Sequence, residues 1–204
     1  MNLKSIVVFV LAGILVFTFN KYRVSKNDRE YQHTILSSSD LKDLPLQRKT
    51  NKAPFNFKEF TIRPMATFFI RARVLSRFEY SQDYEARVSP IDLALGWNRM
   101  ADPNIYEKLN ISQGGRWYRY SWANQPPIPP KEIIESSGNM HMIPRDQVVS
   151  EIINTVTKGD FIKIKGLLVN VESNSGWRWE SSLSREDTGA GACEVVFVEE
   201  VEIQ

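Results

Sequence analysis

The stretch GDFIKIKGLLV at residues 159–169, followed by WRW at 177–179 and CEVVFV at 193–198, decides the fold of this chain. These short β-rich runs are separated by turn residues such as the DTG at 187–189, a pattern that is typical of a small closed or nearly closed sheet. We therefore expect an α+β domain that is mostly β: a small antiparallel barrel or sandwich with one packed helix, preceded by an N-terminal transmembrane helix.

Two segments outside this stretch have a clear period. Residues 67–80 (TFFIRARVLSRFEY) alternate apolar side chains with arginines, which predicts a half-buried antiparallel strand. Residues 145–156 (RDQVVSEIINTV) place valines and isoleucines on one face, which predicts a helix that ends at Gly159. A third segment, ISQGGRWYRYSW at 111–122, holds a Gly-Gly turn, and its aromatic side chains fit either a stacking platform or, as we favour, the core of a sheet.

The charge of the chain is unevenly distributed. Residues 1–50 carry eight Lys/Arg against four Asp/Glu, and residues 141–204 carry six against eleven. A nucleic-acid groove on the acidic last block is disfavoured, because phosphate binding needs an excess of cations. The basic N-terminal part suits a surface that faces anionic lipid headgroups.

An apolar leader predicts membrane attachment. Residues 6–19 (IVVFVLAGILVFTF) carry no charge, and no small-residue cleavage site follows them, so we expect an uncleaved anchor in the lipid bilayer. We assign residues 1–20 to the anchor, 21–56 to a polar linker and 57–204 to a globular β-rich domain. The basic residues after the span favour a cytoplasmic domain, whereas the short tail before it resembles an export signal; we favour the extracytoplasmic, periplasmic side.

Four segments carry a resemblance to a known family: DLALGW at 92–97, the ISQ to WY run at 111–118, NMHMIP at 139–144 and DTGAGACE at 187–194. Together they resemble a family of bacterial single-pass membrane proteins that has no assigned activity. The resemblance covers the chain from about residue 65 onward. It implies a membrane-anchored globular domain and supplies no site residues.

A partial resemblance to sortases rests on His141, Arg185 and Cys193. Sortases are anchored barrel proteins that use a histidine, a later cysteine at a strand end and an arginine beside the oxyanion. This chain departs from that pattern, because Ala192 stands where sortases have a threonine and no arginine follows Cys193. The resemblance would make these three residues catalytic, whereas Glu194 beside the thiol favours a buried, unreactive cysteine at the start of a core strand.

A second set of candidate residues is Trp177 and Trp179. The Gly159-Asp160 turn, the strand after it and Gly166 also suit an OB-like barrel, in which a glycine lets a strand bend around a corner. Such barrels bind nucleic acids or sugars through an aromatic face, and the two tryptophans lie on one side of a strand. Packing in the core is the alternative, and we favour it.

Other chemistry has little support in the sequence. Asp187-Thr188-Gly189 has the letters of the aspartic-protease motif, but the chemistry needs two such carboxylates and the chain has one copy. His141 has no ligand partner at metal spacing, and no phosphate-binding loop is present, so we expect no metal and no cofactor. We expect a non-catalytic binding or assembly module of the cell envelope with an unknown protein partner; the alternative is a cysteine hydrolase or transpeptidase that uses Cys193 and His141.

Overall fold

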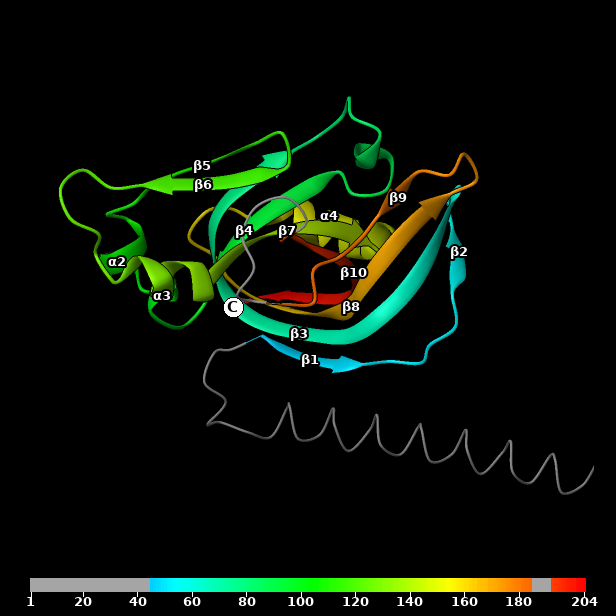
Figure 1. Cartoon of the computed structure of the whole chain (residues 1–204), viewed down its shortest axis with the longest axis horizontal. Helices are drawn as coiled ribbons and strands as arrows, with labels where there is room; N and C mark the ends of the chain where they lie inside the picture. The colour runs from blue at the N-terminus through cyan, green and yellow to red at the C-terminus, as the bar shows by residue number, and fades with distance from the viewer. Residues whose placement is uncertain (1–44, 185–191) are drawn as a thin grey trace, which may run out of the picture. The chain divides into compact units, whose positions relative to one another are not determined.

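The longest strand of the protein is β3 (Phe60–Glu79), around which the sheet is built in the computed structural model (Figure 1). The structure describes residues 45–184 and 192–204. Phe68, Ile70, Ala72 and Val74 are buried, as the alternation predicted. The strand begins seven residues before the predicted Thr67, because Phe60 and Ile62 are buried in a second core.

Within the described residues, five strands pair in a closed ring. They are β3, β4 (Ile91–Gly96), β7 (Ser137–Pro144), β10 (Glu194–Ile203) and β8 (Phe161–Ser173), and β8 pairs back to β3. The β7–β10 pair is parallel and the other four pairs are antiparallel. The prediction of a mostly β chain is therefore confirmed, whereas the parallel β7–β10 pair departs from the predicted antiparallel arrangement.

Short strands extend the ring and add a separate hairpin. β1 (Leu46–Lys49) and β2 (Phe55–Phe57) pair with β3, β9 (Arg178–Trp179) pairs with β8, and β5 (Asn110–Gly114) pairs with β6 (Trp117–Ser121). β1 lies within residues 21–56, which the sequence assigned to the linker. Three of its four residues, Gln47, Arg48 and Lys49, are polar and exposed, as is common in an edge strand, so composition alone did not indicate a strand there.

The main helix, α4 (Gln147–Thr155), lies between β7 and β8 in the sequence and agrees with the predicted helix at 145–156. It begins where the carboxylate of Asp146 accepts a hydrogen bond from the N–H of Val149 (2.9 Å), an N-cap that satisfies an otherwise unpaired donor. Two shorter helices, α2 (Pro103–Tyr106) and α3 (Pro130–Glu135), lie in the segment between β4 and β7.

The buried apolar residues form three cores. The first combines side chains from all five ring strands with Val149 and Ile153 of α4. The second uses the opposite side of β3, β7, β8 and β10, and Phe55, Phe57, Trp177 and Trp179 pack against it. The third lies between Leu75 and Ala94 of the ring and the segment that carries α2, α3 and the β5–β6 hairpin. The ring therefore has packed side chains on both of its sides.

Gly166 marks a close approach of two ring strands. A methyl group added there would overlap the backbone carbonyl oxygen of Phe197 on β10. The glycine predicted at a strand corner is thus required because the β10 backbone passes directly over it.

The described residues belong to one compact unit, which extends over Asp43–Gln204. None of the helices in residues 45–184 and 192–204 is long and apolar enough to span a membrane. The predicted anchor at 6–19 lies outside the described residues.

Candidate functional site

A buried polar cluster lies on β4 and β7, on the side that faces the second core. Asp92 of β4 is the register partner of His141 on β7, and Val195 of β10 is the next partner of His141. Val195 belongs to the second core, and adjacent partners in a sheet point to the same side. The side chain of Asp92 is 0% exposed and that of His141 is 3% exposed. A charge with so little exposure needs partners, because an unpaired buried carboxylate is very costly.

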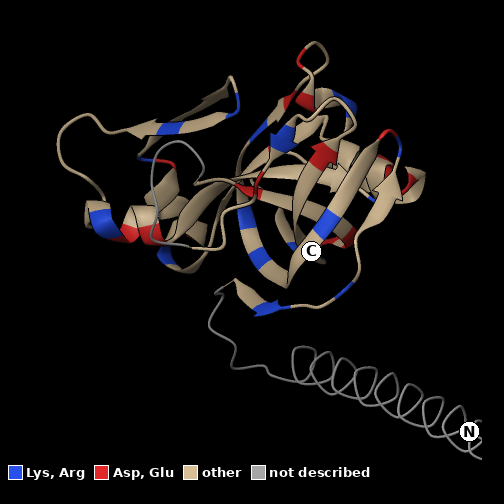
Figure 2. Cartoon of the chain, turned by 45° about the vertical axis from the view of Figure 1, so that its right-hand side comes forward, with Lys and Arg blue, Asp and Glu red and all other residues tan. Residues whose placement is uncertain are grey.

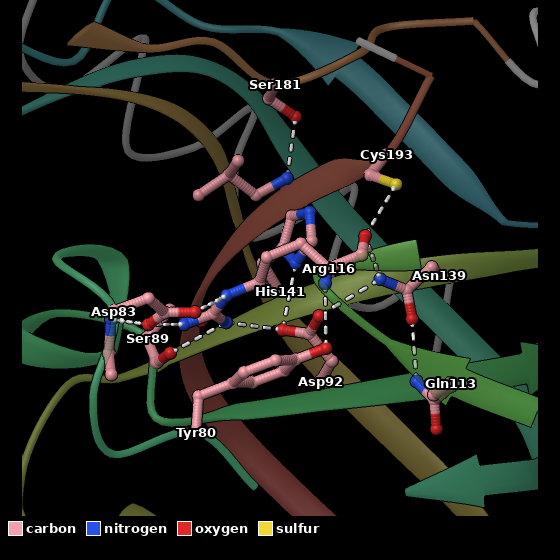
Figure 3. Close-up of polar contacts among 12 residues, drawn as sticks. Tyr80, Asp83, Ser89, Asp92, Gln113, Arg116, Asn139, His141, Ser181 and Cys193 are labelled. Carbon is pink, nitrogen blue, oxygen red and sulfur yellow. Dashed lines mark hydrogen bonds and ion pairs between the residues drawn. The ribbon is translucent and has the colours of Figure 1, made fainter. Parts of the chain in front are cut away.

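Both oxygens of Asp92 have partners (Figure 3). Oδ1 accepts a hydrogen bond from Nη1 of Arg116 (2.8 Å), and Oδ2 accepts one from the side-chain amide of Asn139 (3.1 Å). Nδ1 of His141 lies 2.8 Å from Oδ1, but Nδ1 makes no well-directed hydrogen bond with the described residues. His141 therefore lies against Asp92 without a well-formed hydrogen bond between the two side chains.

Arg116 reaches this cluster from the turn of the β5–β6 hairpin. Its Nε and Nη2 donate to the two carboxylate oxygens of Asp83 (2.9 and 2.7 Å), and its Nη1 also donates to the backbone carbonyl of Ser89 (3.0 Å). The centre of the guanidinium lies 3.7 Å from the ring centroid of Tyr80 and 5.5 Å from that of Trp179. Bidentate, charge-assisted hydrogen bonds are among the strong ones in proteins, and stacking of a guanidinium on an aromatic ring adds to them.

Electrostatics keep this ion pair charged. Burial opposes the charge of Arg116, but the hydrogen bonds and charges of Asp83 and Asp92 outweigh burial and raise the pKa of Arg116. Burial alone would raise the pKa of Asp83; the hydrogen bonds and charge of Arg116, with the N–H of Ala86, lower it below its ordinary value of 3.8. Both groups are therefore ionised at neutral pH.

An amide pair connects the hairpin to the ring. Nε2 of Gln113 on β5 donates to Oδ1 of Asn139 on β7 (2.7 Å), and Nδ2 of Asn139 also donates to the backbone carbonyl of Arg116 (3.2 Å). The same carbonyl accepts a contact from Sγ of Cys193 at 3.9 Å. The hairpin turn is thus held by the side chain of Arg116 and also by its backbone carbonyl.

The structure brings most of the predicted site residues to this region. Trp179 packs on His141, with ring centroids 4.5 Å apart, and Cys193 precedes β10 and is partly exposed. Trp177 contacts Phe60 and Tyr84 edge to face, so both tryptophans are half-buried against the second core. Arg185 lies outside the described residues.

The sequence reasoning missed Asp83, Asp92 and Arg116 as a unit. One signal was available: Asp92 interrupts the apolar run IDLALG at 91–96, and a carboxylate within a buried strand requires a cation or donors nearby. Nothing in the sequence identified Arg116 as that cation, because it lies 24 residues away in another element.

The described residues contain no group of three or more His, Cys, Asp or Glu side chains that could hold a metal ion. Asp83 and Asp92 share their charge with Arg116, which already occupies the space between them. No family model, curated protein or solved structure matches the chain.

Proposed function

We propose that this chain is a membrane-anchored, non-catalytic binding or assembly module of the bacterial cell envelope, whose β-rich part is a small barrel of the OB type. The ring order supports the barrel: β3, β4 and β7 are joined antiparallel in sequence order, and β10 lies between β7 and β8. Helix α4 connects β7 to β8, which are the third and fourth ring strands in sequence order. OB barrels are five-stranded Greek-key barrels of this kind.

Nucleic acid is not the partner that the charges favour. OB barrels bind oligonucleotides on the face of their second and third strands, which here are β4 and β7. In this protein the cluster of Asp92, Arg116 and His141 covers part of that face. Elsewhere on the ring, Lys163 and Lys165 are paired with Glu202 and Glu200 across β8 and β10, so basic and acidic segments lie side by side (Figure 2).

The observation that carries the proposal is the contrast between Arg116 and the residue after it. Arg116 holds the hairpin turn against the ring, while Trp117 is 40% exposed. On β6, Arg119 is exposed as well, whereas Tyr118 and Tyr120 pack against the third core. Trp and Arg are the residue types that contribute most to protein interfaces, and a rigid support lowers the entropic cost of binding. The hairpin is thus a fixed surface for a protein partner.

The test is partner capture by the full-length chain from detergent-solubilised membranes. We expect Trp117→Ser to remove the captured partner without changing the Tm, since Trp117 contributes little to the core. Val148→Ser is the matched control, because Val148 is 65% exposed on α4, on a different element. Equal capture by the wild-type protein and the Trp117→Ser variant would contradict the proposal.

The anchor is a separate part of the proposal. Residues 6–19 form an uncharged run, and we propose that they hold the chain in the bilayer as a single-pass helix with the domain on the periplasmic side. Alkaline carbonate washing of membranes should leave the protein in the pellet. Recovery of soluble protein that starts beyond Asn20 would instead identify the segment as a cleaved signal peptide.

One observation favours the second candidate, a cysteine hydrolase or transpeptidase. His141 lies beside the buried Asp92, as a catalytic base does beside its orienting carboxylate, and Cys193 contacts the same cluster through the Arg116 carbonyl. If the protein is a binding module, iodoacetamide should alkylate Cys193 slowly near neutral pH. The rate of alkylation should be the same in a folded His141→Ala variant. Fast alkylation that depends on His141 would support the enzyme.

A further inference from the structure

The residues that surround the guanidinium of Arg116 all come from the ring or its connecting segments. Tyr80 follows β3, Asp83 and Ser89 lie between β3 and β4, and Asp92 is on β4. Trp179, on β9, is the fifth member of this set. The β5–β6 hairpin contributes the guanidinium and none of these five residues, so occupant and pocket belong to different parts of the fold.

Interactions that do not involve Arg116 hold the walls of this pocket in place. The N–H of Tyr80 donates to the carbonyl of Pro90 (2.8 Å), and Oδ1 of Asp83 accepts from the N–H of Ala86 (2.8 Å). Asn139 holds Oδ2 of Asp92. These contacts remain when the guanidinium leaves, and acceptors that are already held in position favour the binding of a replacement cation.

The geometry selects a guanidinium over an ammonium. Asp83 receives two parallel N–H groups, a third nitrogen is shared between Asp92 and the carbonyl of Ser89, and the flat group lies 3.7 Å from the ring of Tyr80. A lysine ammonium has neither the planar fork nor the face that stacks on an aromatic ring. The pocket thus matches the end of an arginine side chain.

The backbone at Arg116 gives an independent indication. Gly115 and Arg116 form the two-residue hairpin turn and have φ values of 58° and 67°, a region that favours glycine. An arginine there is held against the preference of its own backbone, which costs free energy. The contacts of its guanidinium with the pocket must outweigh that cost.

We propose that Tyr80, Asp83, Ser89, Asp92 and Trp179 form a guanidinium-binding site, which Arg116 fills in the free protein and which takes an arginine side chain of a second protein in its place. This site differs from the Trp117 surface. Its test uses small ligands, so it can fail while partner capture by the hairpin succeeds, and the reverse.

The experiment replaces the occupant. In the full-length Arg116→Gly protein, glycine suits the positive φ of the turn and the pocket is left without its guanidinium. We expect methylguanidinium and N-acetylarginine amide to raise the Tm of this variant in a saturable manner, by about 4 °C at ten times the Kd, and N-acetyllysine amide to have no such effect. The wild-type protein should need higher concentrations for the same shift, because Arg116 competes.

Two variants keep the test specific. Asp83→Asn in the Arg116→Gly background should abolish the Tm shift, because it removes the carboxylate that accepts two N–H groups of a guanidinium. Arg99→Gly breaks an ion pair with Glu132 elsewhere in the protein, and its Tm should shift no more than that of the wild-type protein. If Arg116→Gly is unfolded alone, recovery of cooperative unfolding with the arginine compound and not the lysine compound supports the site. The proposal would be overturned if the arginine and lysine compounds had equal effects. It would also be overturned if neither compound affected the Arg116→Gly protein, whether that variant is folded or unfolded on its own.

Discussion

Asp92 is an aspartate with no exposed surface inside a strand whose other residues are apolar or glycine. Transfer of a carboxylate from water into such a place costs several kcal/mol, and this cost is offset only when both oxygens are bonded and a cation is adjacent. Arg116 and Asn139 supply these partners. The stability of the cluster therefore depends on its completeness more than on any one contact.

Removal of the carboxylate should accordingly be severe. We expect Asp92→Ala to lower the free energy of unfolding by about 3–5 kcal/mol, because it leaves the guanidinium of Arg116 without one of its counter-ions in a buried place. Urea unfolding measures the change. Glu132→Ala, which breaks an exposed pair with Arg99, should cost less than about 1 kcal/mol. Equal losses in the two variants would show that burial does not set the energy.

Asp83 makes the same cluster sensitive to acid. Its pKa is lowered in the folded protein, so the unfolded chain binds the proton more readily, and the contribution of Asp83 to stability is complete above its ordinary value of 3.8 and is lost as the pH falls through the folded pKa. Stability in this acid range should therefore fall less steeply in Asp83→Asn than in the wild-type protein. Urea midpoints measured at several acidic pH values test this. Parallel curves would contradict it.

These residues show what the sequence can and cannot indicate. The apolar period around Asp92 predicts that it is buried, and burial predicts that it has a partner. The identity of the partner depends on how the hairpin turn folds back onto the ring, and the contacts that decide this join Arg116 to residues 24 and 33 positions away. Periodicity within one segment carries no information about such a distance.

At the scale of elements, β8 and β10 approach each other so closely at Gly166 that only glycine fits at this position of the ring. A side chain there would collide with the backbone of Phe197, which cannot move without breaking the β10 pairings. We expect Gly166→Ala to destabilise the protein by about 3 kcal/mol or more, as severe overpacking does. Gly114→Ala is the control, since a methyl group at Gly114 would have no atom within 4 Å. Thermal melting of both variants distinguishes steric collision from a general effect of alanine.

Elements with a strong period could be predicted, and those without one could not. The alternation in β3 and the apolar face of α4 are set by burial on one side, which leaves a period in the sequence. In β7 polar and apolar side chains alternate only over four residues: Asn139 and His141 are buried in the polar cluster, while Met140 and Met142 are buried in the first core. Both faces of β7 are therefore buried, and this short alternation does not show that the polar side chains are buried as well.

At the scale of the molecule, β1 and β2 extend the described sheet to the N-terminal side of residue 57. The rings of Phe55 and Phe57 lie 5.1 and 5.3 Å from that of Phe197, edge to face, and cover the second core. A fragment of residues 43–204 should unfold cooperatively, and one of residues 57–204 should be less stable by about 2 kcal/mol, because it loses β1 and Phe55. Chemical unfolding of the two fragments tests this. Equal stability would place the boundary at residue 57, as composition alone suggested.

The position of β10 in the ring has a consequence for how the chain is made. β10 is the last ring strand to be synthesised, yet in space it lies between β7 and β8. Once β7 and β8 have left the ribosome and before β10 has done so, each of these two flanking strands lacks its neighbour. Contacts between segments distant in sequence form slowly, and strand edges without a neighbour can pair wrongly. The nascent chain therefore has an interval in which an apolar strand of another molecule could insert where β10 belongs, and that interval ends only when residues 194–203 leave the exit tunnel.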